Sequence, residues 1–336
     1  MSAASTNPGG ARPLPPLPTV LIEDVVRSAL EEDLGRAGDL TSDAIVPHDA
    51  RATGRLLARR DGRVAGLAAA LATFRILDPD VRCEVVVGDG GDVRADGGGA
   101  DGSGANDPSA NGPSADRPSS HGSCEPGTIA RVHGRAGALL GAERVALNLL
   151  GRLSGIATAT RAAVHAAHGT KARITCTRKT TPGLRALEKF AVRAGGGANH
   201  RFGLDDAMLI KDNHVVLAAG VRPAIERARA HAGHLVRIEV EVDDMDQLEQ
   251  ALEAGADAIL LDNMNPDQIR EAVRRTAGRA TLEASGGIGP NEVAAYAATG
   301  VDVVSLGWLT HSVPSLDVSL DLVPDATRAG ADRAPC

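Results

Sequence analysis

Short apolar runs alternate with amphipathic runs through the second half of the chain. The apolar runs are rich in Val, Ile and Leu and are too short for helices, which is typical of buried strands. They lie at residues 173–177, 207–210, 235–242, 258–261, 281–284 and 303–306. Helical patterns occupy the intervals between them, at residues 184–194, 214–231, 244–254, 265–275 and 290–298. Repeated strand–helix units predict a parallel sheet covered by helices.

The fold class predicted from this pattern is α/β, a TIM-like barrel that is open or partly closed. A flat doubly wound sheet is the alternative. We favour the barrel because polar residues follow strand after strand, as they do at the carboxyl ends of barrel strands, where active sites lie. A helical segment at 136–168 is expected before the barrel. Gly151 and the Ser154-Gly155 pair leave open whether it is one helix or two.

The first third of the chain predicts a smaller α+β domain. Apolar residues recur with a helical period between residues 19 and 34, and Gly35 is a plausible helix end. Residues 39–47 are expected to form a loop. A helix is expected at 67–77. Strands are expected at residues 51–64, 81–87 and about 125–134.

Two segments have compositions that do not favour a packed structure. Residues 1–18 are rich in Pro and Gly, and residues 95–124 consist almost entirely of small and polar residues. Such segments bury too little apolar surface to offset their ordering entropy. We therefore predict a disordered leader at 1–18, an N-terminal domain at 19–135 with a disordered insertion at about 95–124, a helix and barrel catalytic domain at 136–323, and a tail at 324–336.

The chain is acidic, with a formal net charge of −7, but one segment is basic. Residues 171–214 contain nine Lys and Arg residues but only four acidic residues. The four lysines of the chain all fall in this segment: Lys171, Lys179, Lys189 and Lys211. Every cationic position outside this segment is an arginine. Lysines that occur in such a chain indicate positions that need a compact, movable ammonium, which a planar guanidinium cannot replace. A basic pocket in an acidic protein points to a small anionic ligand and not to nucleic acid, which requires an extended basic face.

A cytoplasmic protein without membrane contact is expected. No apolar run approaches the roughly 20 residues that cross a bilayer, and the first residues show neither a signal nor a transit peptide. The four cysteines are scattered, a spacing that fits neither a metal site nor a disulfide framework.

Charged side chains follow the predicted strands at positions that a barrel would bring together. The cationic ones are Arg178, Lys179, His200, Arg201 and Lys211. Glu241 and Asp262 end neighbouring strands, and two carboxylates beside a phosphate site most naturally hold Mg²⁺, directly or through water. For either carboxylate alone, a salt bridge to Lys or Arg is an equal alternative. His200 standing alone would more often be structural, but next to Arg201 it joins the cationic cluster.

A glycine-rich turn follows the strand at 281–284. Ser285, Gly286 and Gly287 precede a helix expected near Asn291. Glycines let the backbone approach a ligand closely, and free N–H groups at a helix start favour anions. Because the late loops of barrels often bind phosphate, this turn is the predicted phosphate site. The surplus of cations around it fits a polyphosphorylated sugar together with a second anion such as a dicarboxylate.

Several stretches resemble the quinolinate phosphoribosyltransferase family. The longest is TRKTTPGLRALEKFAVRAGGGANHRFGLDDAMLIKDNH, which begins at Thr177. The others, in chain order, are EDLGRAGDLTSDAIVP, AERVALNLLGRLSGIATAT, EVEVDDMDQLEQALEAGADAILLDNM and LEASGGIGPNEVAAYAATGVDVVSLGWLTHS. The resemblance extends over residues 20–323 except the insertion.

The resemblance implies an enzyme that joins quinolinate to 5-phosphoribosyl-1-pyrophosphate with Mg²⁺. The products would be nicotinate mononucleotide, pyrophosphate and CO₂, in de novo NAD synthesis. It also implies a homodimer, or a higher oligomer, in which Arg144 enters the neighbouring subunit's site. Judged from spacing alone, a helical arginine such as Arg144 is more often a solvated surface residue.

Roles for individual residues follow from the same resemblance. The residues implied to bind quinolinate are Arg144, Arg178, His200, Arg201 and Lys211. Those implied to bind the phosphoribosyl donor are Lys179, Lys211, Glu241, Asp262, Ser285, Gly286, Gly287 and Gly307. Those expected to be catalytic are Lys179, Lys211, Glu241 and Asp262, the last two also as Mg²⁺ ligands.

Three other functions fit part of the pattern. A Schiff-base aldolase would use Lys211 as its nucleophile beside a phosphate site, but would not need the extra cations. A phosphate-ligand sensor would keep the pocket without turnover. Nicotinate phosphoribosyltransferase would bind a monocarboxylate and release no CO₂. The insertion is expected to be an accessory whose deletion leaves activity largely intact.

Overall fold

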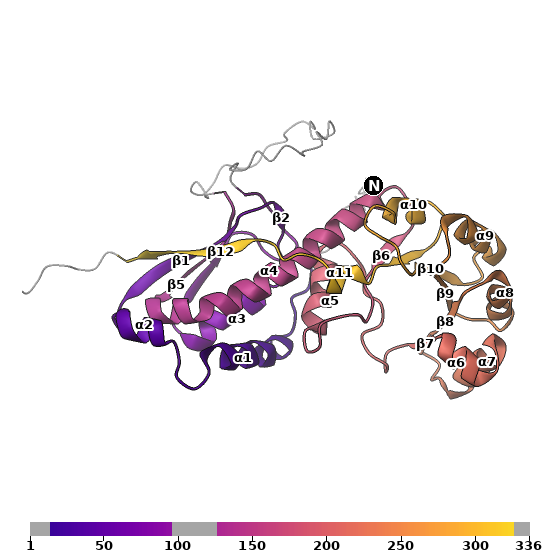
Figure 1. Ribbon diagram of the computed structural model, residues 1–336, viewed down its shortest axis with the longest axis horizontal. Coiled ribbons are helices and arrows are strands. Elements are labelled where there is room, and N and C mark those ends of the chain that lie inside the picture. The colour runs from indigo at the N-terminus through magenta and orange to yellow at the C-terminus, as the bar shows by residue number, and fades with distance from the viewer. Residues whose placement is uncertain (1–13, 96–125, 326–336) are drawn as a thin grey trace, which may run out of the picture.

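The computed structural model describes residues 14–95 and 126–325. It shows two large sheets linked by one long helix, α4 (Ala136–Ala166) (Figure 1). The smaller sheet is antiparallel, with the order β12-β1-β5-β3. Its strands are β1 (Arg51–Ala58), β3 (Arg82–Val85), β5 (Thr128–Arg135) and β12 (Val318–Pro324). A separate pair of short strands consists of β2 (Gly62–Arg63) and β4 (Asp92–Val93).

Alternating burial explains how the smaller sheet covers a core. Every second residue of β1 is buried, and Leu56 at its centre is 0% exposed. This face packs with α3 and α4 around Phe74, which is also 0% exposed. The helices of this half, apart from α4, are α1 (Val20–Leu34), α2 (Leu40–Ile45) and α3 (Leu67–Leu77).

The larger sheet is parallel, with the order β6-β11-β10-β9-β8-β7. Its strands are β6 (Arg173–Thr175), β7 (Met208–Ile210), β8 (Ile238–Val242), β9 (Ala258–Asp262), β10 (Thr281–Ser285) and β11 (Val303–Ser305). This order follows the chain around a ring, and among the described strands only the junction of β6 and β7 is unpaired. A doubly wound sheet would instead change direction in its middle. The predicted open TIM-like barrel is therefore confirmed.

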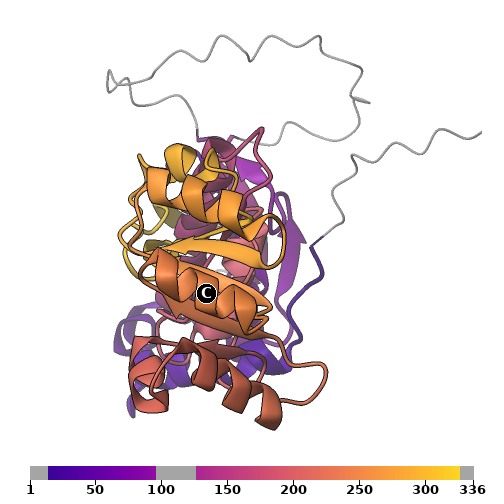
Figure 2. The ribbon, with the colours of Figure 1, turned by 90° about the vertical axis from the view of Figure 1, so that its right-hand side faces the viewer.

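Helices surround the barrel strands on the outside. They are α5 (Arg185–Ala194), α6 (Asp212–Ala218), α7 (Val221–His231), α8 (Met245–Glu253), α9 (Pro266–Thr276), α10 (Val293–Ala297) and α11 (Trp308–His311). Figure 2, which faces this end of the molecule, shows the brown and orange helices in front of the strands. The strand residues that pack against these helices are apolar, and Val240, Ile259, Ala284 and Val304 are each 0% exposed.

The long helix α4 is continuous, although its glycines left two helices as an alternative. The glycines serve close packing instead of a break. A Cβ atom on Gly155 would collide with the carbonyl oxygen of Pro314, and one on Gly151 would come within 2.9 Å of the carbonyl oxygen of Leu316. The returning chain therefore lies directly against the backbone of α4.

Three further expectations from the sequence need correction. The sequence predicts residues 318–323 as part of the barrel unit and residue 324 as part of the tail, but together they form β12, which pairs with β1 in the smaller sheet. Residues 39–47 are not a loop throughout, because Asp39 caps the short helix α2 by accepting the N–H of Ser42. The helix expected at 214–231 is divided at Gly220 into α6 and α7.

The predicted leader and insertion fall largely outside the described residues. Within the leader, Leu14 and Leu17 are described and pack against the core that contains α1, so the end of the expected disordered segment is attached. Most of the insertion at 95–124 and most of the tail at 324–336 lie beyond the described ranges. Among the helices of residues 14–95 and 126–325, none combines the length and apolar character of a membrane span.

Candidate active site

One cavity, of about 360 Å³, lies at the carboxyl ends of the barrel strands. Nine of the predicted site residues line it: Arg178, Lys179, His200, Arg201, Lys211, Glu241, Asp262, Ser285 and Gly286. The other lining residues are Thr177, Leu209, Leu260, Glu283 and Ser305. The cavity therefore combines cationic side chains from the basic segment with carboxylates from later strands.

Two arginines in this cavity have buried nitrogen atoms without a partner among the described residues. These atoms are Nε of Arg178 and Nε of Arg201. The Nη1 atom of Arg201 donates to the carbonyl oxygen of Ala207 at 3.1 Å. Burial, and then the nearby charge of Arg178, lower the pKa of Arg201. Two neighbouring guanidiniums with free donors favour an anion between them, and each can bind a carboxylate through two parallel hydrogen bonds.

His200 lies between two acidic side chains. Its Nε2 atom is 3.1 Å from Oε2 of Glu239 and 3.5 Å from Oε1 of Glu283. Its Nδ1 atom accepts the N–H of Arg201 at 2.7 Å. Burial lowers the pKa of His200, but the hydrogen bond to Glu239 and the charges of Glu283 and Glu239 outweigh it, so the pKa is raised. Because both ring nitrogens have protein partners, His200 must release one of them before it can contact a substrate carboxylate.

Glu283 is a site residue that the sequence did not identify. Its side chain is 7% exposed. Burial together with the charge of Glu239 raises its pKa to about 7, while His200 acts in the opposite direction. The spacing held a signal, because Glu283 precedes Ser285 by two positions on β10, so both side chains share one face. His200, Glu239 and Glu283 also have possible metal-ligating atoms within 4.8 Å of one another. A proton shared among these three side chains is sufficient to explain why they lie so close together.

Lys211 and two carboxylates form a second charged group in the same cavity. The Nζ atom of Lys211 is 2.9 Å from Oε2 of Glu241, whose side chain is 9% exposed. Burial raises the pKa of Asp262, and the charges of Glu241 and Asp243 raise it further. These carboxylates repel one another, so they offer an all-oxygen site that a hard divalent cation would stabilise. The residues present therefore fit Mg²⁺.

The glycine turn after β10 is held close to the end of β9. Gly286 has φ +92°, and a Cβ atom there would collide with the side chain of Asn263, whose N–H donates to the carbonyl oxygen of Ser285 at 2.9 Å. On the other side, Nε1 of Trp308 donates to the carbonyl oxygen of Ile288 at 3.0 Å. The short helix α10 begins only at Val293, so the predicted phosphate site is a loop of backbone N–H groups and not a helix terminus.

Lys179 is fixed from the barrel's last loop. Its carbonyl oxygen accepts the Oγ1–H of Thr310 at 2.8 Å, and its N–H donates to Oγ1 of Thr177 at 3.1 Å. Gly307 does not line the cavity, but a Cβ atom at this position would lie 3.3 Å from Cδ of Lys179. Gly307 therefore leaves room for the Lys179 side chain.

Besides Gly307, two other predicted site residues do not line this cavity. Gly287 is outside its lining, and nothing comes within 4 Å of a Cβ atom built there. Arg144 is an exposed residue of α4 and is not part of the cavity wall. Within a single chain, the structure therefore does not bring Arg144 together with the other cations.

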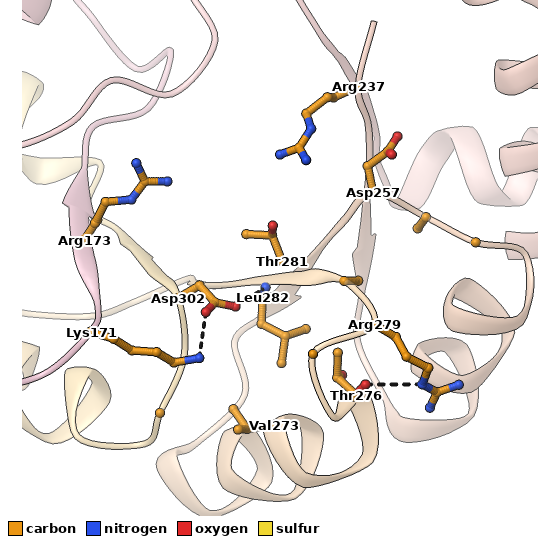
Figure 3. Close-up of a pocket in the computed structure, with 15 residues that line it drawn as sticks. Lys171, Arg173, Arg237, Asp257, Val273, Thr276, Arg279, Thr281, Leu282 and Asp302 are labelled. Atoms are coloured by element: carbon orange, nitrogen blue, oxygen red, sulfur yellow. Dashed lines mark hydrogen bonds and ion pairs between the residues drawn. The ribbon is translucent and has the colours of Figure 1, made fainter. Parts of the chain in front are cut away.

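A larger cavity, of about 680 Å³, lies at the opposite end of the strands (Figure 3). Its acidic side chains form hydrogen bonds to the backbone of the sheet. Asp257 accepts the N–H of Ile238, and Asp302 accepts the N–H of Leu282, each at 2.9 Å. Asp302 also pairs with Lys171 at 2.7 Å. None of the predicted site residues lines this larger cavity. Since active sites of barrel enzymes lie at the carboxyl ends of the strands, the larger cavity is not the candidate active site.

Comparison with known proteins places the whole fold in one family. Residues 39–154 match the model of the quinolinate phosphoribosyl transferase N-terminal domain, and residues 156–321 match that of the C-terminal domain. The boundary between the two matches falls within α4.

Individual relatives agree along most of their length. The chain is 44% identical over 291 residues to a probable nicotinate-nucleotide pyrophosphorylase (carboxylating) of Bacillus subtilis (strain 168), covering 87% of this chain and 90% of the relative. It is 44% identical over 304 residues to the nicotinate-nucleotide pyrophosphorylase (carboxylating) of Mycobacterium leprae (strain TN), covering 89% and 96%. The crystal structure of NadC from Streptococcus pyogenes superposes with a TM-score of 0.80 at 36% identity, covering 92% of this chain and 99% of that one. The chain belongs to the quinolinate phosphoribosyltransferase family.

Proposed function

We propose that the chain transfers the phosphoribosyl group of 5-phosphoribosyl-1-pyrophosphate to quinolinate and releases CO₂, giving nicotinate mononucleotide and pyrophosphate. The observation that carries this proposal is the pair of buried, unpartnered Nε atoms of Arg178 and Arg201 in a cavity that also holds a carboxylate cluster and a glycine turn. A dicarboxylate satisfies the arginines, and a phosphorylated sugar suits the opposite wall.

Quinolinate would lie against the basic wall. Arg178 and Arg201 each offer a fork of donors to a carboxylate. Lys211 stands at 2.9 Å from Glu241 and can exchange this partner for a ligand oxygen, since its side chain is 50% exposed. His200 supports Arg201 by accepting its N–H, so we assign His200 mainly to the orientation of this wall.

The phosphoribosyl donor would lie along the wall formed by β8, β9 and β10. Ser285, Gly286 and Gly287 would hold its 5-phosphate, and Lys179 would approach the pyrophosphate. Glu241 and Asp262 would face the ribose and hold Mg²⁺, directly or through water. When bound, Mg²⁺ would neutralise charge that develops on the departing pyrophosphate. The carboxylates would stabilise the positive charge that develops on the ribose.

The chemistry then needs mainly orientation and charge from the protein. The ring nitrogen of quinolinate attacks the anomeric carbon as pyrophosphate leaves. The resulting cationic pyridinium stabilises the carbanion left at C2 when CO₂ departs, and C2 then takes up a proton from solvent to give nicotinate mononucleotide. Holding both substrates in a near-attack arrangement supplies much of the rate. No covalent intermediate on the protein is required, and Lys211 is proposed to bind ligand and not to form a Schiff base.

A homodimer would complete the site, with Arg144 of each chain entering the partner's cavity. Two observations support this arrangement. Leu40 and Ile45 of α2, which packs on α4 where Arg144 lies, are 70% and 73% exposed. Val216 and Leu217 of α6, which follows Lys211 at the cavity mouth, are 77% and 84% exposed. Contact between these two apolar surfaces would bring Arg144 to the mouth of a second chain. A higher oligomer and the expected cytoplasmic location stay predictions.

Turnover of the full chain with quinolinate and with nicotinate, each with the phosphoribosyl donor and Mg²⁺, tests the proposal. We expect nicotinate mononucleotide from quinolinate and at most about 1% of that rate from nicotinate, because removal of one carboxylate leaves an arginine unpaired. Equal turnover of the two acids would favour a nicotinate phosphoribosyltransferase. Borohydride-dependent inactivation with a carbonyl substrate would favour the aldolase alternative, and binding without turnover would favour a sensor.

A further inference from the structure

Helix α5 buries two adjacent charged residues, Glu188 and Lys189, each with 0% exposed surface. An ionised group without water is strongly destabilising unless protein partners replace its hydration. The partners of Glu188 are the N–H of Thr181 at 3.0 Å, its hydroxyl at 2.8 Å, and Nη2 of Arg152 at 2.9 Å. Glu188 thereby holds the segment that follows β6 and carries Arg178.

Lys189 has a different set of partners. Its Nζ atom donates to the carbonyl oxygen of His200 at 2.9 Å and lies 3.3 Å from Sγ of Cys176. It also lies 5.1 Å from the ring centroid of Phe202. Within residues 14–95 and 126–325, no carboxylate forms an ion pair with Lys189. Its ammonium is therefore held by two chain segments, one at the end of β6 and one before β7.

These two segments carry the arginines that face the cavity. Arg178 follows Cys176 by two residues, and Arg201 lies between His200 and Phe202. The strands β6 and β7 are not paired with each other. Direct contacts between the two segments are an isolated bridge between Thr175 and Ala198 and a hydrogen bond from Sγ of Cys176 to Oδ1 of Asn199 at 3.4 Å.

Helix α5 supplies further connections across this open side of the barrel. Arg185 donates to Oγ1 of Thr180 at 3.0 Å and to the carbonyl oxygen of Phe202 at 2.9 Å, and Lys189 contacts both segments from a fully buried position.

We propose that Lys189 is a positioning residue whose ammonium joins these two segments and sets the separation of the Arg178 and Arg201 guanidiniums. This separation selects ligands with two neighbouring carboxylates, so the inference rests on the proposed function and adds a specificity determinant to it. Lys189 does not itself line the cavity.

A space-filling role does not account for a lysine at this position. Methionine would occupy a similar volume without the cost of desolvating a charge. Burial lowers the pKa of Lys189, and Cys176 opposes this effect, so an ammonium here carries a desolvation cost that a hydrocarbon side chain would not have. An ammonium with three donors can bind a carbonyl oxygen and a sulfur at once, which a hydrocarbon cannot.

The test is Lys189→Met in the full chain, with the KM measured separately for quinolinate and for the phosphoribosyl donor at saturating Mg²⁺. We expect the KM for quinolinate to rise roughly tenfold or more, because a small displacement of a binding group costs this much. The KM for the donor should stay within about threefold, since most of its proposed contacts lie on β8 to β10 and the backbone of Lys179 is held by Thr310 and Thr177 instead of by Lys189. A merely structural role would not separate the two constants.

Leu187→Ala is the matched control, since Leu187 lies on the same helix, is 1% exposed and packs only in the core. It should lower Tm and leave both KM values unchanged. If Lys189→Met does not fold, Cys176→Ala removes one partner and keeps the charge, and we expect a rise of about two- to fivefold in the quinolinate KM.

Three results would overturn the proposal. The first is a folded Lys189→Met enzyme whose quinolinate KM stays within threefold of the parent. The second is an equal rise in both constants. The third is an unfolded Lys189→Met together with an unchanged Cys176→Ala. Absence of quinolinate turnover in the parent chain is a different outcome, because it contradicts the proposed function itself.

Discussion

Replacement of Glu283 by Gln should remove a specific part of the pH dependence of stability. Glu283 is buried, and its pKa rises from 4.5 to about 7. The folded chain therefore binds a proton more tightly than the unfolded chain does between these values. Stability from this proton is present below pH 4.5 and is lost as pH rises through about 7.

The size of the effect follows from the two pKa values. Each unit of difference corresponds to 1.36 kcal/mol, so the loss across this window is about 3 kcal/mol. His200 acts in the same direction, because its raised pKa means that its stabilising proton is also lost as pH rises. Glutamine keeps an oxygen that can accept the Nε2–H of His200 but carries no charge.

Urea unfolding at fixed protein concentration, at intervals from pH 4 to pH 8, measures this difference. We expect the free energy of unfolding of the parent to fall by about 3 kcal/mol more than that of Glu283→Gln. Glu253→Gln is the control, because this carboxylate is 62% exposed and pairs with Arg222 on the surface, and it should follow the parent. Parallel curves for the parent and Glu283→Gln would refute the assignment of a proton to Glu283 at neutral pH.

The remaining predictions concern binding, assembly and packing. Arg178→Ala and Lys211→Ala should each lower turnover more than about tenfold, because each removes a cation proposed to bind a substrate carboxylate; near-normal rates in either would contradict the site. Arg144→Ala should be inactive alone, and mixing it with Lys211→Ala should restore part of the activity, since a mixed dimer has one intact site; no recovery would argue against the shared site. Gly155→Ala should destabilise the chain by about 2 kcal/mol through overpacking, while Gly137→Ala on the same helix, with nothing within 4 Å, should be neutral or slightly stabilising in chemical denaturation.

Local pattern was sufficient to predict most of the fold. The helix expected at 67–77 is α3 (Leu67–Leu77), and each predicted barrel strand overlaps an observed one. These elements have a clear apolar period, because each buries one face or both. The order of strands around the barrel also followed, since repeated strand–helix units connect neighbours with one hand.

What escaped prediction depends on contacts between distant segments. The pairing of β12 with β1 joins residues near both ends of the described chain, and nothing in either strand specifies its partner. Gly155 was read as a possible break in α4, but its role is visible only once Pro314 lies against it. Both are long-range effects that override local propensity.

The site shows the same division. The position of each residue at the end of a strand predicted which side chains would meet, and nine of them share one cavity. Their partners were not predictable: His200 was expected to face the ligand but has Glu239 and Glu283 at its Nε2 atom. The sequence identifies Lys189 only as one of four lysines in the basic segment. Its complete burial between two loops is visible only in the folded structure.

The most direct measurement of the central claim is CO₂ release from quinolinate labelled at the 2-carboxyl carbon, followed together with pyrophosphate release. If the cations hold the dianionic ring beside the phosphoribosyl donor, CO₂ should appear only when the donor and Mg²⁺ are present, with one CO₂ for each pyrophosphate. Release of CO₂ without the donor, or of pyrophosphate without CO₂, would contradict it.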